Sequence, residues 1–563
     1  MFCLNLLYVF MISVPYNQTV KEVMMHSDTI AYINGRFYTM RVPGETVEAV
    51  VVRDGVFLYC GNRTEALRLS GGNCVDLGGR TVLPGLIDDH QHVQTYARNL
   101  MKVDLSGARS IEDVQALIHR RAARTPPGKL ILGTGFDQTK FTEDRLPTRW
   151  DLDRAAPDHP VVITRYCLHI NVANTPALSR GGLLTSVSLP DGVERDGSGQ
   201  LTGRMQEREA AQLINTITDG VDLTREELKD ALVQALGLAN SFGITSVHPI
   251  QGKLCNLFEQ TDLYQDLRDE GRLTCRIYLG DDEFPGCSIR SGLGDEMVRY
   301  GFYKIYTDGS LGARTALFTR PYHDSPAETG TCHYDQAQLD EMVKAAYDRH
   351  LQTAVHAIGD QAVEMTLIAL KKAHDANPRP WDQVRFRLTH CSLINDRIIG
   401  MLREMPMIID MQPGYVSTNI HWSDDRVGPD RAPYLFAWRT LMDLGLTLCG
   451  SSDLPCENLN PLVGVYAVET RSGYDGYLPQ GWQPQERLTR YEALSLYTKN
   501  PAYASFEEDR KGTIEAGKLA DFAVFDRDIC SVPAPELLQA QVEQTYLGGR
   551  LIYDRSAPKT QHP

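Results

Sequence analysis

The chain has 563 residues, enough for several domains or for one α/β barrel with additions, since a typical domain holds about 150 residues. Hydrophobic residues make up 42% and charged residues 23%, which excludes disordered, collagen-like and disulfide-scaffold proteins. The formal net charge of −15 repels a phosphate backbone, so we expect no nucleic-acid partner. Twelve cysteines without a C-x-x-C pair favour a reducing, cytoplasmic location.

Residues 1–26 are predicted to be an N-terminal extension. The apolar stretch 1–14 is too short to span a bilayer, lacks the basic start of a secretory signal and precedes no A-x-A cleavage site. We therefore expect no stable membrane insertion. A signal or anchor in residues 1–14, which would make the protein secreted or membrane-anchored, is the alternative.

The two ends of the remaining chain are rich in short β-strand patterns. Hairpin signals occur at Asn34-Gly35 and Asp54-Gly55, because positive φ angles at a tight turn suit Asn, Asp and Gly. Residues 512–528 and 544–554 show the same short β-strand patterns broken by turns. We predict that residues 27–82 and 505–563 together form one small β-sandwich domain.

Between these ends, apolar strand patterns and amphipathic helix patterns alternate eight times. A capping box at Thr224 and Glu227, for example, opens a helix that Gly243 ends. Eight β-α units predict an α/β fold, a (β/α)8 TIM-type barrel over residues 83–504, with functional groups at the carboxyl ends of its strands. The expected strands are 86–92, 244–250, 274–280, 302–308, 353–359, 384–390, 407–413 and 446–453.

The first two expected strands are about 150 residues apart, far more than a β-α loop requires. We predict an inserted subdomain over residues 94–223. Covering a bound ligand is one use for such an insert.

Four histidines and one aspartate fall at the ends of the expected barrel strands. His90 and His92 end the first strand, His356 the fifth, His390 the sixth and Asp453 the eighth. Because side chains alternate along a strand, His90 and His92 point to one side. A lone histidine at a strand end is more often structural, but this joint placement predicts a metal site. Imidazole ligands suit zinc, with manganese, iron and cobalt as alternatives.

The residues around these positions resemble the amidohydrolase superfamily. Residues 84–92 (PGLIDDHQH) are similar to its first-strand signature. The likeness extends over nearly the whole chain after residue 28, and it implies a distorted (β/α)8 barrel with a small β-sandwich made from both termini. It also implies metal-dependent hydrolysis of an amide-like, non-peptide C–N bond in a small molecule. The strings that resemble the type 3 group, which contains N-substituted formamide deformylase, include 304–315 (KIYTDGSLGART), 356–360 (HAIGD) and 451–455 (SSDLP).

By this resemblance, Lys304 on the fourth strand corresponds to a lysine that CO2 converts to a carbamate, which bridges two metal ions. Burial near dications lowers the pKa of an amine, so that its neutral form can attack CO2. A charge pair of Lys304 with Asp308 is the alternative, and then Glu207 is the substitute bridge or a single metal ion is held. The resemblance implies about two Zn²⁺ ions per chain, with the ligands His90, His92, Lys304, His356, His390 and Asp453.

At such a site, zinc lowers the pKa of a bound water to about 7, and the resulting hydroxide attacks a carbonyl group. Asp453 is the expected catalytic residue, because it can pass the proton to the departing amine. Two other functions stay open: a non-catalytic or regulatory binding protein, and a metal-dependent isomerase or lyase on the same scaffold. The oligomeric state stays open as well, a homodimer included.

Five residues are candidates for contacts with the substrate. Asp137, His169 and Asn174 in the insert match strings that resemble those of the family, although local capping and turn hydrogen bonds explain them equally well. Arg314 suits a substrate carboxylate or a pair with Asp308. Gln412 is a polar candidate at the end of the seventh strand.

For four more residues, we compare a role at the site with a role in packing. We expect His248 to pack in the core or to support the site rather than to touch the substrate. Tyr415 and Trp422 are expected to be buried packing residues rather than a binding pocket. Asp410 interrupts an apolar strand, and the sequence offers no explanation for it.

Overall fold

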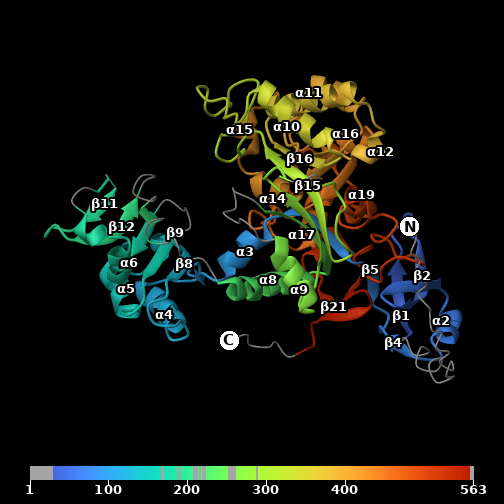
Figure 1. Ribbon diagram of the computed structural model, residues 1–563, viewed down its shortest axis with the longest axis horizontal. Helices are drawn as coiled ribbons and strands as arrows, with labels where there is room; N and C mark the ends of the chain where they lie inside the picture. The colour runs from blue at the N-terminus through green and yellow to red at the C-terminus, as the bar shows by residue number, and fades with distance from the viewer. Residues whose placement is uncertain are drawn as a thin grey trace, which may run out of the picture.

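The described part of the chain forms three β-sheets (Figure 1). The computed structural model describes residues 29–165, 170–186, 189–190, 192–206, 213–214, 217, 224–251, 261–286 and 289–557. The predicted extension 1–26, His169 and Glu207 lie outside the described residues. Among the described helices, none is both long and apolar enough to cross a membrane.

Eight parallel strands form the central sheet, one for each predicted strand. They are β6 (Leu86–Gln91), β13 (Ile244–Gln251), β14 (Arg276–Asp281), β15 (Val298–Tyr306), β16 (Gln352–Ala357), β17 (Arg387–His390), β18 (Ile408–Met411) and β19 (Thr447–Gly450). The predicted (β/α)8 barrel is therefore confirmed. The fourth strand starts earlier than predicted, because Val298 and Arg299 already pair with β14.

The barrel is closed just beyond the end of β19. The backbone N–H of Asp453 donates to the carbonyl of His90 at 2.9 Å, and the N–H of His92 donates to the carbonyl of Leu454 at 2.8 Å. These two hydrogen bonds join the segment after the eighth strand to the end of the first. Closure thus places three of the predicted metal ligands next to one another.

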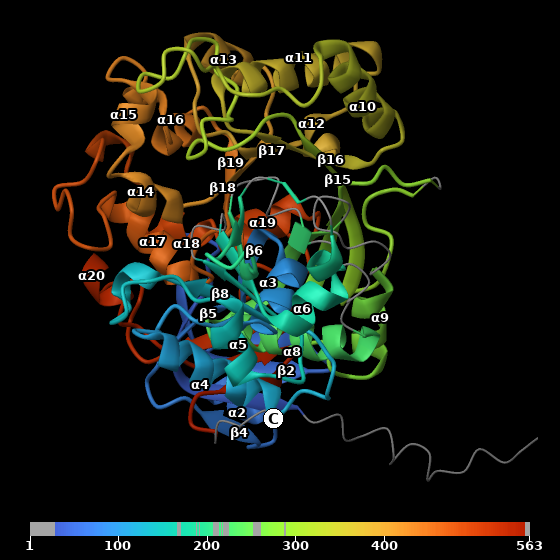
Figure 2. The ribbon, with the colours of Figure 1, turned by 90° about the vertical axis from the view of Figure 1, so that its left-hand side faces the viewer.

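Helices surround the barrel strands (Figure 2). Helix α8 (Arg225–Asn240) begins at the predicted capping box, in which Thr224 Oγ1 accepts the N–H of Glu227 at 3.2 Å. Gly243, with φ of 81°, follows it, and a Cβ there would lie 2.9 Å from the Cβ of Ala523. The other helices of this layer are α3 (Val93–Leu100), α9 (Thr261–Asp269), α10 (Gln336–Asp348), α11 (Asp360–Ala376), α12 (Trp381–Val384), α13 (Asp396–Leu402), α14 (Gly414–Asn419), α15 (Ser423–Val427), α16 (Trp438–Asp443), α17 (Pro461–Thr470), α18 (Arg490–Ser495) and α19 (Lys499–Ala504).

The two ends of the described chain share a second sheet. Its strands are β1 (Ile30–Tyr38), β2 (Thr46–Arg53), β3 (Val56–Gly61), β4 (Cys74–Asp76), β5 (Thr81–Pro84), β20 (Phe522–Phe525), β21 (Val542–Leu547) and β22 (Arg550–Asp554), with the helices α2 (Arg63–Leu69) and α20 (Ala534–Leu537). The antiparallel pair β5–β20 joins the two ends. The N–H of Phe57 donates to the carbonyl of Lys518 at 2.8 Å, so the sheet curls around an aromatic core.

A buried ion pair fixes this terminal sheet to the barrel. Arg276, the first residue of β14, contacts both carboxylate oxygens of Asp521 at 2.7 and 2.9 Å. The N–H of Gly548 adds a third donor to the same carboxylate, at 2.7 Å. A paired and hydrogen-bonded carboxylate of this kind holds the two bodies in one orientation.

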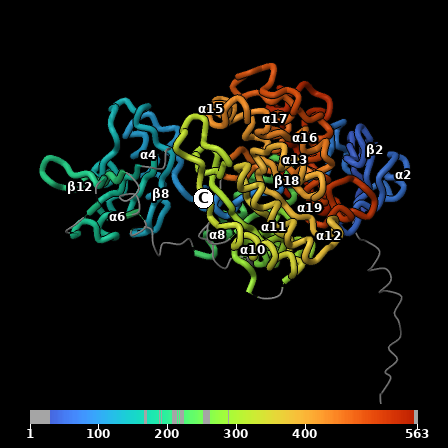
Figure 3. The backbone as a smooth tube through the Cα atoms, turned by 90° about the horizontal axis from the view of Figure 1, so that it is seen from above, coloured from blue at the N-terminus to red at the C-terminus, as the bar shows by residue number. Residues whose placement is uncertain are grey.

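The segment between β6 and β13 builds a third sheet with its own core. Its strands are β7 (Val103–Asp104), β8 (Ile131–Phe136), β9 (Val161–Arg165), β10 (Ile170–Ala173), β11 (Val193–Arg195) and β12 (Leu201–Gln206), with α4 (Ile111–Ala122), α5 (Arg149–Ala155) and α6 (Thr175–Arg180). Figures 1 and 3 show this insert as a lobe on the side of the barrel opposite to the terminal sheet. Helix α3 overlaps the start of the predicted range 94–223 but packs in the barrel core, because Val93 and Ala97 are buried there.

One buried arginine links the strands inside the barrel. Arg387 on β17 contacts Asp89 on β6 at 2.8 Å and Asp410 on β18 at 3.0 Å, and all three side chains are fully buried. His248 on β13 contacts Asp89 at 2.7 Å, so it packs in the core as predicted. Asp410, which the sequence left unexplained, is thus a counter-charge of this guanidinium.

We predict that Arg387→Met strongly destabilises the protein, by about 3–5 kcal/mol in the free energy of unfolding, because it leaves two buried carboxylates without their cation. Urea unfolding monitored by circular dichroism measures the change. Arg320→Met is the matched control, since Arg320 and Asp430 form an exposed pair, and we expect little change there. Equal stability of Arg387→Met and the natural protein would contradict the assignment.

Candidate metal centre

The closure of the barrel gathers imidazole and carboxylate groups at the carboxyl ends of the strands. His90 is the second-last residue of β6, His390 ends β17 and Asp453 follows β19, and all three are buried. One nitrogen or oxygen of each lies within 4.8 Å of the others. Nε2 of His90 is 3.3 Å from Asp453 Oδ1, and Nε2 of His92 is 3.4 Å from the same oxygen.

Asp453 is held as a buried carboxylate with two different faces. Its Oδ1 faces His90 and His92, whereas its Oδ2 accepts a hydrogen bond from the hydroxyl of Tyr415 at 2.8 Å. Burial acts to raise the pKa of Asp453, but the contacts with the two histidines outweigh it and hold this pKa well below its usual value. The group is therefore an anion at neutral pH.

The backbone is strained at two members of the cluster. His390 has φ of 72° and Asp453 has φ of 49°, in the left-handed region that residues other than glycine rarely adopt. Such conformations persist where the surrounding structure fixes them, and they are common at functional sites.

A glutamine fixes the orientation of His390. Its ring Nδ1–H donates to Oε1 of Gln412 at 2.6 Å, while the amide of Gln412 donates to Ser451 Oγ at 3.1 Å and to the carbonyl of Asp410 at 3.2 Å. Nε2 of His390 is thereby left with its lone pair for a cation. The side chain of Gln412 is thus engaged by protein groups, and its contact with a substrate stays a prediction.

Burial keeps the imidazoles in their neutral form. It lowers the pKa of His90 to about 3, with the charge of Lys304 as the next cause. It also lowers the pKa of His390 well below the usual value, with His356 as the next cause. Neutral imidazoles are the form that binds a metal ion.

His356 lies beside this group rather than inside it. Its ring is 4.4 Å from that of His390, and its Nε2–H donates to the carbonyl of Gly309 at 3.1 Å. Nδ1 of His356 is therefore the nitrogen left for a metal ion. Its Nε2 also lies 3.4 Å from Asp308.

Lys304 is buried on β15, and its charge acts on both His90 and His390. The carboxylate of Asp308 accepts the backbone N–H groups of Leu317, Ile358 and Gly359 at 2.8 to 3.0 Å. Asp308 thereby ties the loop after β15 to the loop after β16, and a charge pair with Lys304 stays the alternative to a carbamate.

The donor set fits a divalent transition metal ion. The imidazoles of His90 and His390 and the carboxylate of Asp453 converge in a buried place, with the His92 ring beside them, and this is the ligand chemistry that zinc and its neighbours prefer. The Nδ1 of His90 is buried and has no hydrogen-bond partner among the described residues. A cluster of this kind costs free energy unless a cation satisfies it.

The comparisons with known proteins agree with this arrangement. A sequence profile described as "Amidohydrolase family" matches residues 73–553. The chain belongs to the amidohydrolase family. It is 29% identical over 531 residues to the putative amidohydrolase YtcJ of Bacillus subtilis, across 93% of this chain and 99% of that protein.

Two further proteins are similar to this chain over most of its length. The N-substituted formamide deformylase of Arthrobacter pascens is 27% identical over 547 residues, which cover 93% of this chain and 98% of that enzyme. An uncharacterized metal-dependent hydrolase from Pyrococcus furiosus superposes with a TM-score of 0.74 at 31% identity, covering 89% of this chain and all of that chain. The resemblance to this group of amidohydrolases is confirmed, and the chain is a hydrolase of that family.

The described insert residues predicted to touch substrate have local roles in this amidohydrolase. Asn174 is fully buried, caps α6 and bonds to the backbone of Val161 and His159. Asp137 caps the turn that follows β8 and lies 3.6 Å from Arg165. For both residues the structure supports the capping alternative and shows no contact with the metal centre.

Arg314 also differs from its prediction. Its guanidinium lies 2.9 Å from Asp324 rather than from Asp308, and Arg426 contacts the same carboxylate at 2.8 Å. Asp324 is therefore shared by two arginines of the rim loops, which explains Arg314 without a substrate.

The sequence did not predict two contacts near Asp453. Tyr415 was predicted to pack, yet its hydroxyl binds Asp453. Asp88 accepts both the N–H and the hydroxyl of Ser452, at 3.0 and 2.5 Å, across 364 residues of sequence. Burial raises the pKa of Asp88 to about 7. The sequence shows Asp88 two residues before His90, but it does not show that Ser452 is the partner of Asp88.

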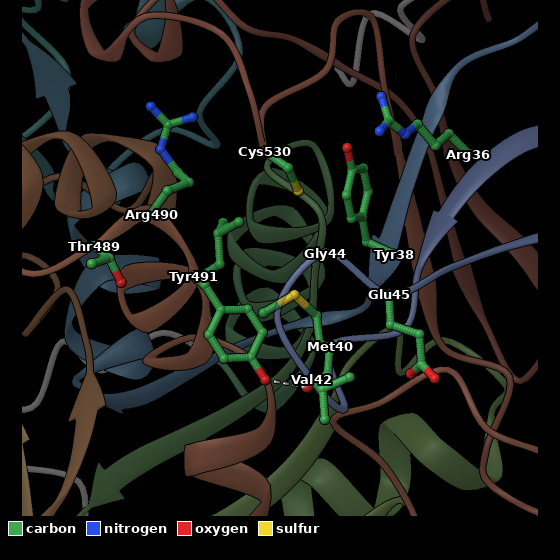
Figure 4. Close-up of a pocket in the computed structure, with 11 residues that line it drawn as sticks. Arg36, Tyr38, Met40, Val42, Gly44, Glu45, Thr489, Arg490, Tyr491 and Cys530 are labelled. Carbon is green, nitrogen blue, oxygen red and sulfur yellow. Dashed lines mark hydrogen bonds between the residues drawn. The ribbon is translucent and has the colours of Figure 1, made fainter.

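A separate cavity of about 340 Å³ lies between β1 and α18 (Figure 4). The hydroxyl of Tyr491 donates to the carbonyl of Met40 at 3.2 Å, and that of Tyr38 donates to Asp528 at 3.0 Å. These lining hydroxyls are satisfied by the protein itself, so the cavity shows no chemistry comparable to that of the metal centre.

Proposed function

We propose that this amidohydrolase cleaves an amide-like C–N bond of a small molecule, of the N-substituted formamide kind, with one or two divalent metal ions, zinc first among them. The observation that carries the proposal is the buried group of His90, His390 and Asp453, whose ligand atoms lie within 4.8 Å of one another at the strand ends. His92, His356 and Lys304 adjoin this group and complete the proposed ligand set. A cytoplasmic site of action is part of the same proposal, as the scattered cysteines favour.

The residues of the chain divide the chemistry among them. A bound zinc ion would supply a water of lowered pKa and a polarised carbonyl group. His90, His92 and His390 would hold it with neutral nitrogens, and Gln412 keeps the ring of His390 in the required orientation. Asp453, an anion beside these histidines, would accept the proton of the attacking water and pass it to the departing nitrogen.

The relative from Arthrobacter pascens supports the substrate class. That enzyme is named for the deformylation of N-substituted formamides, and the match covers nearly its whole length. Substrate choice depends on rim loops and on the insert, where fold similarity alone carries little weight. The formamide class is thus the first set of compounds to assay.

We predict that protein purified without chelator contains about two transition-metal ions per chain and hydrolyses a compound from a panel of N-substituted formamides. Elemental analysis and product assays measure both. Removing the metal should abolish turnover, zinc should restore it, and one oxygen of the product acid should derive from ¹⁸O-labelled water. His390→Ala should lose metal, whereas His119→Ala, an exposed histidine of the insert, should not.

Two results would overturn this proposal. Protein without bound metal after growth in zinc-supplemented medium would indicate a binding protein on the same scaffold. Metal-dependent turnover without incorporation of ¹⁸O would indicate an isomerase or a lyase.

We also predict that Lys304→Ala loses one or both metal ions together with activity. The physical reason is that a carbamate on Lys304 would provide two oxygen ligands, which alanine removes. Small carboxylic acids should restore part of the activity, because they mimic the carbamate. Lys371→Ala, which removes an exposed lysine paired with Asp375, is the control. Full metal content and full activity in Lys304→Ala would remove the bridging role from this residue.

A further inference from the structure

The hydroxyl of Tyr415 lies directly against the proposed catalytic carboxylate. Tyr415 is on α14, which follows β18, and it donates to Asp453 Oδ2 at 2.8 Å. The other oxygen of Asp453 faces His90 and His92 at 3.3 and 3.4 Å. The two oxygens of one carboxylate therefore have separate partners, a phenol on one side and the metal-binding imidazoles on the other.

Helix α14 is fastened to the loop that carries Asp453 at a second point. Thr418 Oγ1, one turn after Tyr415, donates to Glu457 Oε1 in the same loop as Asp453. The start of the helix packs against this carboxyl group as well, since a Cβ on Gly414 would lie 2.7 Å from Glu457 Oε2. Tyr415 thus approaches Asp453 from a rigid support, and its side chain is partly buried.

A phenol suits both protonation states of a carboxyl group that moves a proton. The O–H of a phenol can donate to one oxygen of a carboxyl group whether or not the other oxygen carries a proton. A phenylalanine ring would fill nearly the same space but could not donate this bond. The hydrogen bond of Tyr415 can therefore persist while Asp453 gains and loses a proton.

We propose that Tyr415 is a positioning residue for Asp453: it holds Oδ2 so that Oδ1 stays turned toward the metal centre before and after proton transfer. This inference rests on the proposed function, since it assigns a task to the same carboxylate. Groups that orient metal ligands through a hydrogen bond typically contribute 10- to 100-fold to metal affinity or activity, on the order of the effect expected here.

The test compares Tyr415→Phe, Asp453→Asn and the double variant. Zinc affinity of the metal-free proteins is measured by competition with a chromophoric chelator, and kcat and KM are measured on the substrate found for the natural protein. Tyr434→Phe is the matched control, because Tyr434 makes the same kind of bond, to Asp396 at 2.9 Å, on an exposed surface. Circular dichroism and thermal unfolding verify that each variant is folded.

We predict that Tyr415→Phe weakens zinc binding and lowers kcat, each by on the order of 10-fold, with little change in KM. In the Asp453→Asn background, Tyr415→Phe should cause no further loss, because the residue acts through Asp453. Tyr434→Phe should leave zinc affinity and kcat unchanged.

Unchanged zinc affinity in Tyr415→Phe would overturn the assignment, as would a double variant whose loss equals the product of the two single losses. The zinc measurement requires no substrate. If the natural protein binds zinc but hydrolyses none of the panel, the proposed function fails, and the role of Tyr415 is still decided by the zinc affinities alone.

Discussion

Two backbone hydrogen bonds between the segment after β19 and the end of β6 hold the rest of the site together. They run from the N–H of Asp453 to His90 and from the N–H of His92 to Leu454. The same residues that close the barrel carry the candidate metal ligands on their side chains. Closing the barrel and assembling the metal centre are therefore one structural event, and the positive φ angle of Asp453 is fixed by it.

A layer of buried charge supports this closure from within the barrel. Arg387 ties β17 to β6 and β18. His390 ends β17, His90 lies near the end of β6, and Gln412 follows β18 and binds His390. Because the charges are fully buried, each depends on its partners, and the loss of one leaves the others uncompensated. Asp88 braces the loop of Asp453 in a similar way through Ser452. The ligands thus sit on strands whose spacing is fixed by hydrogen bonds below and beside them.

The sequence was sufficient to predict the barrel architecture and the positions of the histidines at its strand ends. Strand and helix periodicity located the eight strands, and the order of His90, His92, His356, His390 and Asp453 along them predicted the candidate metal centre. These features are local in the chain, or they follow from the rule that functional groups occupy the carboxyl ends of barrel strands.

The contacts around those ligands were not predictable, because they depend on register between distant strands. Nothing in the sequence pairs Asp410 with Arg387, or the hydroxyl of Tyr415 with Asp453, until the barrel is closed. Gln412 was placed at the correct strand end, but its hydrogen bond with His390 was not predicted. Asn174, in contrast, has a local role as the cap of α6, and this role was predictable from the neighbouring sequence.

The proposed metal centre is tested most directly by anomalous diffraction at the zinc absorption edge from crystals of zinc-loaded protein. We predict a zinc peak in the barrel mouth, about 2.0–2.2 Å from nitrogen atoms of the histidine cluster and from an oxygen of Asp453. Density for a carbamate on Lys304 should accompany a second peak. Crystals that contain zinc only at surface sites, with no peak beside His90, His390 and Asp453, would contradict it.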